Sequence, residues 1–402
     1  MQFKIIKESK NSRARTGIIK TPHGNIHTPY FIPVATAATV RGLNQEDIKS
    51  INAEVLLANT YHLHLKPGDN IIKKLNGLHK FMNWNKPLFT DSGGFQAFSL
   101  GYGMEHNINK LGNIFLQNKK AKKEDKKDKL ATIDDKGVTF KDPSSGKLVH
   151  LNPKKSIQIQ QNLGADIILA FDECTSPLSD YNYTKKAMER THKWALQSLK
   201  YHNKKSKTTK QSIYGIVQGG EYKDLRIKSA KFISPLDFDG IAIGGSLGKS
   251  KLDMHKILNW VVPLLPDNKP RHLLGIGNIE DLFECVEKGI DTFDCVAPTR
   301  IGRRGALFIS PQSGGDLKNK FRINIKNSKF KLDKKPIDKN CSCLTCKNYS
   351  RAYLNHLYKS QELAYYKLAS LHNVNFMLRL MEKIRDAINN AEFKKLKKEW
   401  LK

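Results

Sequence analysis

The chain has 402 residues, 39% of them hydrophobic, and its 69 Lys and Arg against 38 Asp and Glu give a net charge of +31. No apolar run reaches the roughly 18–20 residues of a membrane-spanning helix, and the first residues lack the apolar stretch of a secretory signal. These features exclude a membrane protein and predict a cytoplasmic one. The charge favours a polyanionic partner such as a nucleic acid, although lysine-rich stretches such as 118–129 add charge without requiring one.

Short apolar runs recur along the chain, and each ends in a polar or glycine-rich segment. The residues at these ends are Asp91, Asp172, Gln218, Gly244 with Gly245, Gly277 and Asp294. Continuous apolar runs of about four to seven residues are typical of strands buried on both faces of a parallel sheet. Segments with helical spacing, such as 183–201, separate them. This alternation predicts a parallel α/β sheet or barrel.

The polar side chains at the strand ends predict one functional site. In α/β barrels the chemistry lies where strands end and loops begin, so we expect three acids and one amide to converge there. They are Asp91, Asp172, Asp294 and Gln218. A single aspartate of this kind could instead be a turn or cap residue, but the set together favours a site.

Two regions interrupt the alternation. Residues 106–150 begin with a lysine-rich run, which we interpret as a solvated loop, and continue with two turn signals around short alternating segments, which predict a hairpin. Residues 305–375 lack helical spacing until a helical stretch over 349–371, and a basic amphipathic helix is predicted from Val374 onward. We therefore expect a barrel domain over 1–304, a subdomain over 305–375 and a C-terminal helix over 376–402 that packs back on the barrel.

A cysteine cluster predicts a metal centre. Cys341, Cys343 and Cys346 form a C-x-C-x-x-C pattern that offers three thiolates from one turn, and structural Zn²⁺ takes four Cys or His ligands in a tetrahedron. His356 and His372 are candidates for the fourth ligand. We prefer His372, because it ends a predicted helix that can fold back on the cluster. The prediction is one structural zinc ion per chain.

Five motifs, in this order, resemble the tRNA-guanine transglycosylase family of bacterial type. They are FTDSGGFQ (89–96), FDECT (171–175), GIVQGG (215–220), FDCVAPTR (293–300) and CSCLTC (341–346) followed by His372, and the resemblance extends from about Thr16 to Leu380. It implies a (β/α)8 TIM barrel with a zinc-binding insertion near the C-terminus, a homodimer, and a pentosyltransferase of queuosine biosynthesis. Such an enzyme exchanges the wobble guanine, position 34, of GUN-anticodon tRNAs for a 7-deazaguanine through a covalent enzyme–tRNA intermediate.

The resemblance also implies roles for individual residues. Asp294 would be the nucleophile at the ribose C1′ and Asp91 the general acid/base, which suits the two displacements of a covalent mechanism. The residues implied to bind the base are Ser92, Gly93, Gly94, Phe95, Asp172, Gln218, Gly244 and Gly245. Phe95 would stack on the ring, and Asp172 would accept hydrogen bonds from two base N–H groups. The residues implied to contact the anticodon loop are Gly275, Ile276, Gly277, Asn278, Ile279, Glu280, Asp281, Thr299, Arg300, Ile301, Gly302 and Arg303.

One segment departs from the bacterial pattern. This chain has GGSLGKS at 244–250 where bacterial members usually have GGLAVGE, so Gly248 replaces Val and Ser250 replaces Glu. Loss of the Val side chain would widen the pocket enough for the bulkier queuine. Because the resemblance over the whole chain is to the bacterial type, we expect 7-aminomethyl-7-deazaguanine as the incoming base with queuine as an alternative. Two other readings are a non-catalytic RNA-binding subunit, which needs no pair like Asp91 and Asp294, and an archaeal-type enzyme, which would carry an appended RNA-binding domain.

Overall fold

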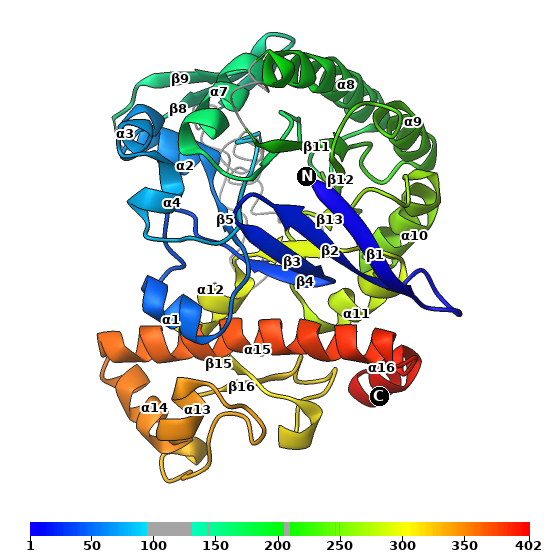
Figure 1. Ribbon diagram of the computed structural model, residues 1–402. Coiled ribbons are helices and arrows are strands. Elements are labelled where there is room, and N and C mark those ends of the chain that lie inside the picture. The colour runs from blue at the N-terminus through cyan, green and yellow to red at the C-terminus, as the bar shows by residue number, and fades with distance from the viewer. Residues whose placement is uncertain (95–130, 143–144, 205–209, 246, 249) are drawn as a thin grey trace, which may run out of the picture.

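The computed structural model describes residues 1–94, 131–142, 145–204, 210–245, 247–248 and 250–402. Its centre is a sheet of eight parallel strands in the order β4-β14-β13-β12-β11-β10-β6-β5. They are β4 (Tyr30–Pro33), β5 (Leu56–Ala58), β6 (Leu88–Thr90), β10 (Ile167–Leu169), β11 (Ser212–Val217), β12 (Gly240–Ile243), β13 (Arg271–Leu273) and β14 (Thr292–Cys295). A parallel bridge between Val34 and Leu57 joins the two edge strands. The sheet therefore closes, and the predicted (β/α)8 barrel is confirmed (Figure 1).

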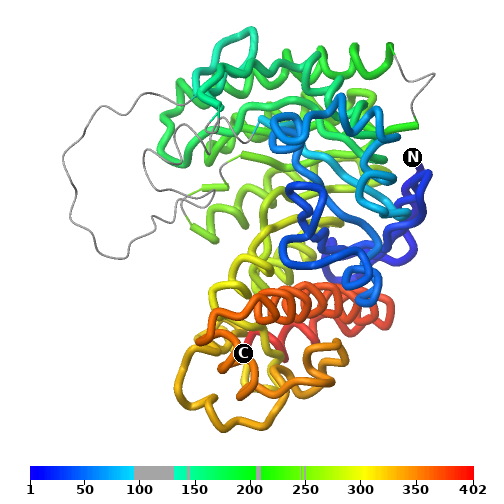
Figure 2. The backbone as a smooth tube through the Cα atoms, turned by 90° about the vertical axis from the view of Figure 1, so that its left-hand side faces the viewer, coloured from blue at the N-terminus to red at the C-terminus, as the bar shows by residue number. Residues whose placement is uncertain are grey.

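Helices cover the outside of the barrel (Figures 1 and 2). They are α1 (Gln45–Ser50), α2 (Thr60–Leu65), α3 (Asp69–Lys74), α4 (Gly77–Phe81), α7 (Pro153–Leu163), α8 (Tyr181–Asn203), α9 (Lys223–Ile233), α10 (Lys251–Val261) with the 3-10 turn η1 (Val262–Leu264), α11 (Ile279–Glu287) and α12 (Ala297–Arg303). Helix α8 matches the helix predicted over 183–201. Because helices lie on one face and the barrel interior on the other, every residue of β11 is buried, as its continuous apolar sequence predicts.

Side chains from strands that are not neighbours meet inside the barrel. The ring of Phe89 on β6 lies 5.7 Å from that of Tyr214 on β11 and 5.6 Å from that of His272 on β13, between centroids. All three side chains are buried. Large side chains in layers are the usual filling of such a barrel, and His272 is the basic member of this layer.

An antiparallel sheet of three strands covers the amino end of the barrel (Figure 1). Its strands are β1 (Gln2–Glu8), β2 (Arg15–Thr21) and β3 (Gly24–Thr28). Arg15 donates to both carboxylate oxygens of Asp291, at 2.9 and 2.7 Å, and Asp291 directly precedes β14. A bidentate, buried pair of this kind fixes the sheet against the barrel end, which leaves the opposite, carboxyl end for the site.

The inserted region contains one more strand than the predicted hairpin. Strands β7 (Ala131–Asp134), β8 (Gly137–Lys141) and β9 (Leu148–Leu151) form an antiparallel sheet. Val138, Phe140 and Leu151 are fully buried and belong to the main hydrophobic core, so apolar burial anchors the insertion. The lysine-rich run 118–129 lies outside the described residues.

The C-terminal region packs below the barrel in Figure 1. It comprises β15 (Ala306–Phe308), η2 (Pro311–Ser313), β16 (Arg322–Asn324), η3 (Ser328–Phe330), α13 (Leu344–Asn348), α14 (Arg351–Lys359), α15 (Leu363–Asn389) and α16 (Phe393–Trp400). Helix α15 has the barrel on one side and α13, α14, β15 and β16 on the other. Among the described residues, none of the helices combines the length and apolarity needed to cross a bilayer.

The helix boundaries predicted near residues 371–374 are wrong, because α15 runs without a break through His372 and Val374. A domain boundary at 375–376 would fall inside this helix. The sequence here holds no Gly or Pro, only two asparagines, and both are buried and bonded. Asn373 Nδ2 donates to the carbonyl oxygen of Pro298 at 2.9 Å, and Asn375 Nδ2 donates to Cys341 Sγ at 3.4 Å. Tertiary hydrogen bonds therefore override the low helix propensity of Asn.

Candidate active site and metal centre

Four of the predicted side chains come together at the carboxyl end of the barrel. Asp91 directly follows β6, Asp172 lies just beyond β10, Gln218 directly follows β11, and Asp294 is within β14. Gln218 Nε2 donates to Asp172 Oδ2 at 2.7 Å. The charges of Asp294 and Asp172 both act on Asp91, so the three carboxylates share one local field.

Asp91 is held by the turn that follows the neighbouring strand β5. The backbone N–H of Thr60 donates to its Oδ1 at 2.8 Å, and Asn59 Nδ2 donates to its Oδ2. Burial raises the pKa of Asp91 to about 7, the Thr60 N–H opposes this shift, and the negative charges of Asp294 and Asp172 add to it. A carboxyl group with a pKa near neutrality can give and take a proton at physiological pH.

Asp294 lies where β13 and β14 end side by side. The backbone N–H of Gly275 donates to its Oδ1 at 2.9 Å. Nε2 of His272 lies 3.3 Å from the same oxygen. Asp294 is therefore a carboxylate held in a defined orientation at the strand end, and its charge acts on Asp91, whose pKa is raised.

Asp172 forms a polar pocket with the loop after β6. Its Oδ1 accepts from Ser92 Oγ at 2.7 Å and its Oδ2 from Gln218 Nε2 at 2.7 Å. The backbone at residue 94 lies so close to Asp172 that only glycine fits there, because a Cβ at this position would lie 2.2 Å from the carbonyl oxygen of Asp172. Asp172 is 5% exposed, so its carboxylate is a buried acceptor. Gly93 lies in the same loop, and the predicted stacking residue Phe95 falls outside the described residues.

A buried arginine, which the sequence did not reveal, fixes the backbone of the pocket. Arg226 on α9 is fully buried, and it donates to the carbonyl oxygens of Gly220, Val217 and Gly244 at 2.7, 3.1 and 3.0 Å. Burial lowers its pKa to about 9. The backbone N–H of Gly244 donates to the carbonyl oxygen of Val217 at 3.1 Å. Of the two backbone N–H groups expected to bind the base, the one left for this role is therefore that of Gly245.

Three residues of the barrel-end site were not predicted: Asn59, Arg226 and His272. Asn59 directly follows β5, and the strand-end rule that selected Asp91 would have found it. His272 lies within an apolar run and Arg226 in the middle of a helix. Neither position carries a sequence signal of its own.

The two segments expected to contact RNA lie beside this end of the barrel. In the first, Gly275–Asp281, the side chains of Ile276, Ile279 and Asp281 are buried and Asn278 is exposed. In the second, Thr299–Arg303, Thr299 and Gly302 are buried while Arg300 is exposed. Side-chain contact with a large partner is therefore limited to the exposed and half-buried members of the two segments.

An arginine cluster extends the second segment. Burial, and after it the positive charges of Arg41, Arg300 and Arg304, lower the pKa of Arg303. Nη1 of Arg303 is buried, with no hydrogen-bond partner in the described part of the chain. Arg41, in the loop after β4, carried no signal in the sequence. Four mutually repelling cations at one place are suited to an anionic ligand.

The steric argument for a widened pocket at Gly248 is wrong. Gly248 has a φ of +87°, and a Cβ there would lie 2.2 Å from the Cβ of Asp253. Ser250 caps α10, since its Oγ accepts from the backbone N–H of Asp253 at 3.2 Å, and the Asp253 carboxylate accepts from the backbone N–H of Ser250 at 3.0 Å. Gly248 and Ser250, the two residues that depart from the bacterial pattern, thus both lie at the start of α10. Leu247 beside them is fully buried.

The four predicted metal ligands form a compact cluster. Nδ1 of His372 lies 3.8, 3.7 and 3.3 Å from the Sγ atoms of Cys341, Cys343 and Cys346. For a tetrahedral Zn²⁺ with Zn–S of about 2.3 Å and Zn–N of about 2.0–2.1 Å, the S···N separation is about 3.5–3.6 Å. The donor set can therefore hold a metal ion, and His372, not His356, completes it.

Groups around the cluster orient the His372 ring and lower a thiol pKa, and both effects favour cation binding. His372 Nε2 lies 2.7 Å from the carbonyl oxygen of Phe308, so Nε2 carries the proton and the Nδ1 lone pair faces the sulfurs. Hydrogen bonds from the thiols of Cys341 and Cys346 lower the pKa of Cys343. His372 lies in the middle of α15, so a metal ion here ties the cysteine turn to the helix that contacts the barrel.

Two neighbouring carboxyl groups at the mouth of a barrel, one of them with a raised pKa, are suited to displacement at a sugar carbon, which indicates an enzyme of the glycosyl-transfer class. A family model described as "Queuine tRNA-ribosyltransferase" matches residues 9–402. A "Putative queuine tRNA-ribosyltransferase" of Archaeoglobus fulgidus is 59% identical over 394 residues, covering 97% of this chain and 96% of that protein. "Queuine tRNA-ribosyltransferase" proteins of Bacillus velezensis and Staphylococcus aureus are each 44% identical, over 96% and 99% of this chain and 92% and 95% of theirs.

The chain belongs to the queuine tRNA-ribosyltransferase family, as the five motifs predicted. It is a pentosyltransferase of the tRNA-guanine transglycosylase kind, and its family acts on tRNA.

Proposed function

We propose that this enzyme exchanges the wobble guanine, position 34, of GUN-anticodon tRNAs for a 7-deazaguanine through a covalent enzyme–tRNA intermediate. The observation that carries the proposal is the pairing of Asp294, oriented by Gly275 at 2.9 Å, with Asp91, whose pKa is raised to about 7. One group is prepared to attack as a carboxylate and the other to carry a proton.

The two carboxyl groups divide the reaction between them. Asp294 attacks C1′ of the ribose, the C1′–N9 bond breaks, its electron pair leaves with guanine, and protonated Asp91 gives its proton to the departing base. Asp91, now ionised, then takes the N9 proton of the incoming 7-deazaguanine, whose nitrogen attacks C1′ and releases Asp294. A covalent intermediate splits one hard displacement into two easier ones and keeps the sugar from water between them.

Asp172 and its neighbours would recognise the base. A carboxylate can accept two adjacent donors, so Asp172 suits the N1–H and 2-amino groups of guanine. Gln218, whose Nε2 donates to Asp172 at 2.7 Å, and the Gly245 N–H suit the O6 side. Ser92, Gly93 and Gly94 supply close backbone, and Phe95 is assigned the stacking role by motif alone. Because Gly248 is required by the helix start, we retain 7-aminomethyl-7-deazaguanine as the incoming base and treat queuine as the competitor to be tested.

The arginine cluster is the proposed contact with the anticodon loop. Arg300, Arg303, Arg304 and Arg41 bring four positive charges to the carboxyl end of the barrel, where they would bind phosphates. Gly275–Asp281 and the rest of Thr299–Arg303 would line the same approach. Phosphate contacts position an RNA without reading its sequence, so discrimination among bases is left to the Asp172 pocket. We place this activity in the cytoplasm.

We propose that Cys341, Cys343, Cys346 and His372 hold one structural Zn²⁺ per chain. The all-Cys/His donor set supports zinc, which favours these ligands in a tetrahedron, and Cys343 and Cys346 are buried. Four protein ligands leave no open position for substrate, so the ion would contribute stability and take no part in base exchange.

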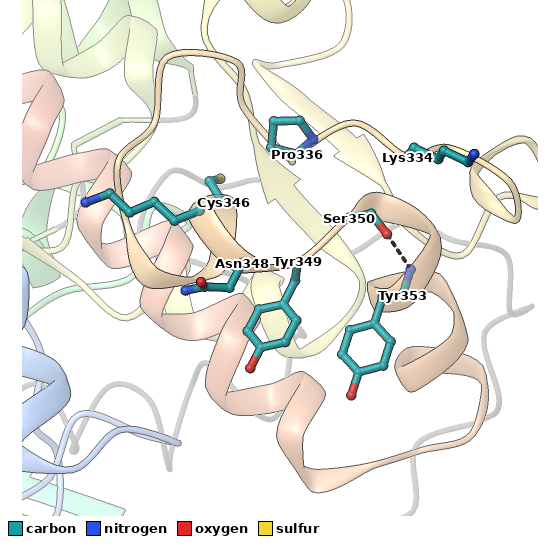
Figure 3. Close-up of a pocket in the computed structure, with 8 residues that line it drawn as sticks. Lys334, Pro336, Cys346, Asn348, Tyr349, Ser350 and Tyr353 are labelled. Atoms are coloured by element: carbon teal, nitrogen blue, oxygen red, sulfur yellow. Dashed lines mark hydrogen bonds between the residues drawn. The ribbon is translucent and has the colours of Figure 1, made fainter.

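We also propose a homodimer formed through the C-terminal subdomain. Tyr349 and Tyr353 stack at 5.4 Å beside a surface pocket that Lys334 and Pro336 also line (Figure 3). The same subdomain exposes Leu332 (86%), Leu344 (45%) and Leu363 (82%). Exposed apolar side chains on one subdomain are candidates for a protein–protein contact. In sedimentation experiments the native protein should be a dimer and Tyr353→Lys a monomer. If both sediment as monomers, the assignment is refuted.

Base exchange on tRNA tests the proposed function. The enzyme is incubated with a GUN-anticodon tRNA carrying labelled guanine at position 34, and release is measured with 7-aminomethyl-7-deazaguanine, with queuine and with neither. We expect release with the first base and a slower or absent response to queuine. Asp172→Asn should weaken the affinity for the base while tRNA affinity stays within about two-fold, because an amide presents a donor where an acceptor is needed. Tight tRNA binding without any release would indicate a non-catalytic RNA-binding subunit.

A further inference from the structure

His272 is a polar side chain at a position where a barrel normally places an apolar one. It is the middle residue of β13, fully buried, and its ring packs against Phe89 across the barrel interior. Such interior layers are usually filled by branched apolar residues. Burying an imidazole costs free energy unless its nitrogens are bonded. The polar atoms near the two ring nitrogens therefore indicate the role of His272.

Both nitrogens of His272 face β14, the strand that carries Asp294. Nδ1 lies 2.9 Å from Oγ1 of Thr292, and Nε2 lies 3.3 Å from Oδ1 of Asp294. Sheet register produces this arrangement, because His272 and Thr292 are directly paired in the parallel ladder. Nε2 makes no hydrogen bond in the described part of the chain, because its 3.3 Å approach to Oδ1 of Asp294 does not have hydrogen-bond geometry.

The chemistry of these contacts fixes the tautomer. An ionised carboxylate only accepts hydrogen bonds, so Nε2 must carry a proton where it faces Asp294. In the neutral ring Nδ1 is then an acceptor, and the Thr292 hydroxyl donates to it. Oδ1 of Asp294 therefore faces two donors, the Gly275 N–H at 2.9 Å and the His272 Nε2–H at 3.3 Å. The second approach is close but not aligned as a hydrogen bond, and catalytic hydrogen bonds are often long or poorly aligned until substrate binds.

We propose that His272 is a positioning residue for Asp294, with Thr292 holding its tautomer. This inference rests on the proposed nucleophilic role of Asp294. When substrate binding aligns His272 Nε2–H with this oxygen beside the Gly275 N–H, the two donors fix the plane of the carboxylate and favour its ionised form, so that the attack on C1′ needs no rotation of the side chain. Groups already oriented for the transition state lower its free energy without reorganisation during the reaction. His272 itself touches neither base nor ribose.

Three substitutions test the role. His272→Leu removes both nitrogens, His272→Gln keeps an N–H donor, and Thr292→Val removes the hydroxyl without changing side-chain volume. The rate of covalent adduct formation in a single turnover and kcat are measured together with KM for tRNA. We expect His272→Leu to lower kcat and the adduct rate about 10- to 100-fold, with KM within about two-fold, and His272→Gln to recover most of that loss. Thr292→Val should lie between wild type and His272→Leu.

Each result bears on one claim. A kcat for His272→Leu within two-fold of wild type, or a His272→Gln variant no faster than His272→Leu, would overturn the positioning role. If His272→Leu does not fold, Thr292→Val decides, and an unchanged adduct rate would overturn it equally. Asp294→Asn is measured in parallel. Wild-type enzyme without base exchange refutes the proposed function, whereas an active wild type, an inactive Asp294→Asn and an unaffected His272→Leu refute the positioning role alone.

Discussion

The pKa of Asp91 determines whether it can act as the acid/base while Asp294 acts as the nucleophile. Its ordinary pKa of 3.8 is raised to about 7, mainly by burial and further by the charges of Asp294 and Asp172, against the opposing Thr60 N–H. Near pH 7 the side chain therefore exists in both forms. Two neighbouring carboxyl groups whose pKa values are driven apart are the usual basis of an acid and a nucleophile in one site.

Adduct formation should slow as the pH rises through about 7. The first step needs protonated Asp91 to supply the departing guanine with a proton, and that form disappears above its pKa. Single-turnover formation of the covalent adduct, measured from about pH 5.5 to about pH 8.5, checks this. Asp91→Asn should be slow at every pH, because the amide has no proton to give. A rate that climbs steadily across this range would contradict the assignment of Asp91 as the acid.

Asp91 should also make the folded protein less stable as the pH rises. Its folded pKa is above its unfolded value, so the folded state binds the extra proton, and the resulting stability is complete below about pH 4 and lost by about pH 7. The slope is at most about 1.4 kcal/mol per pH unit. Thermal unfolding of wild type and Asp91→Asn across this pH window isolates the contribution. The wild type should lose stability relative to the variant, and parallel curves would show that the pKa of Asp91 is not perturbed.

Strand-end residues were predictable from sequence, and interior or helical ones were not. Asp91, Asp172, Gln218 and Asp294 follow apolar runs, and parallel strands carry such residues to one edge. Arg226 is recognisable only by the three carbonyl oxygens it reaches, at 2.7–3.1 Å. No local pattern could reveal those contacts, because the carbonyl groups belong to the end of β11 and to the loops after β11 and β12.

At the scale of elements, the start of α10 explains the departure from the bacterial pattern. Gly248 adopts a φ of +87° two residues before Ser250, which forms the helix cap with Asp253. The sequence suggested a pocket residue because it showed the missing Val side chain but neither the backbone angle nor the neighbouring Asp253. The continuous helix α15 was missed for a related reason, since its asparagines are stabilised by partners distant in sequence.

Gly248→Val should therefore destabilise the protein without a selective effect on the larger base. A β-branched residue at this φ and a contact of 2.2 Å with Asp253 together cost about 2–4 kcal/mol. Gly314→Val is a matched control, because Gly314 has a φ of +88° but a Cβ added there would meet no atom within 4 Å. Chemical denaturation should show a larger loss for Gly248→Val than for Gly314→Val. Equal losses, or suppression of queuine use alone, would favour the pocket role.

At the scale of the whole molecule, the cluster of Cys341, Cys343, Cys346 and His372 connects the cysteine turn of the C-terminal subdomain to α15, the helix that packs on the barrel. His372 projects from the same helix whose Asn373 bonds to Pro298 of α12 at 2.9 Å and whose Tyr365 bonds to Gly302 at 2.8 Å. The C-x-C-x-x-C spacing was enough to predict three ligands. The choice between His356 and His372 depended on the path of the helix, which the sequence placed only approximately.

His372→Ala should lower the zinc content of the purified protein well below one ion per chain and reduce its thermal stability. His356→Ala is the matched control, because His356 is exposed and lies outside the cluster. Metal binding to the folded state alone contributes to folding free energy, so a chelator should lower the unfolding temperature of wild type and leave His372→Ala little changed. Full zinc occupancy in His372→Ala, or loss in His356→Ala, would contradict the assignment.

The central claim is that Asp294 bonds covalently to the ribose during base exchange. Wild type and Asp294→Asn are mixed with an anticodon stem-loop RNA, quenched with denaturant in the absence of the incoming base, and separated on a denaturing gel. The wild type should give an RNA–protein adduct that disappears when 7-aminomethyl-7-deazaguanine is added before the quench. Asp294→Asn should give none, and its exchange rate should fall by at least about a thousand-fold. An adduct formed by Asp294→Asn at the wild-type rate would contradict the account.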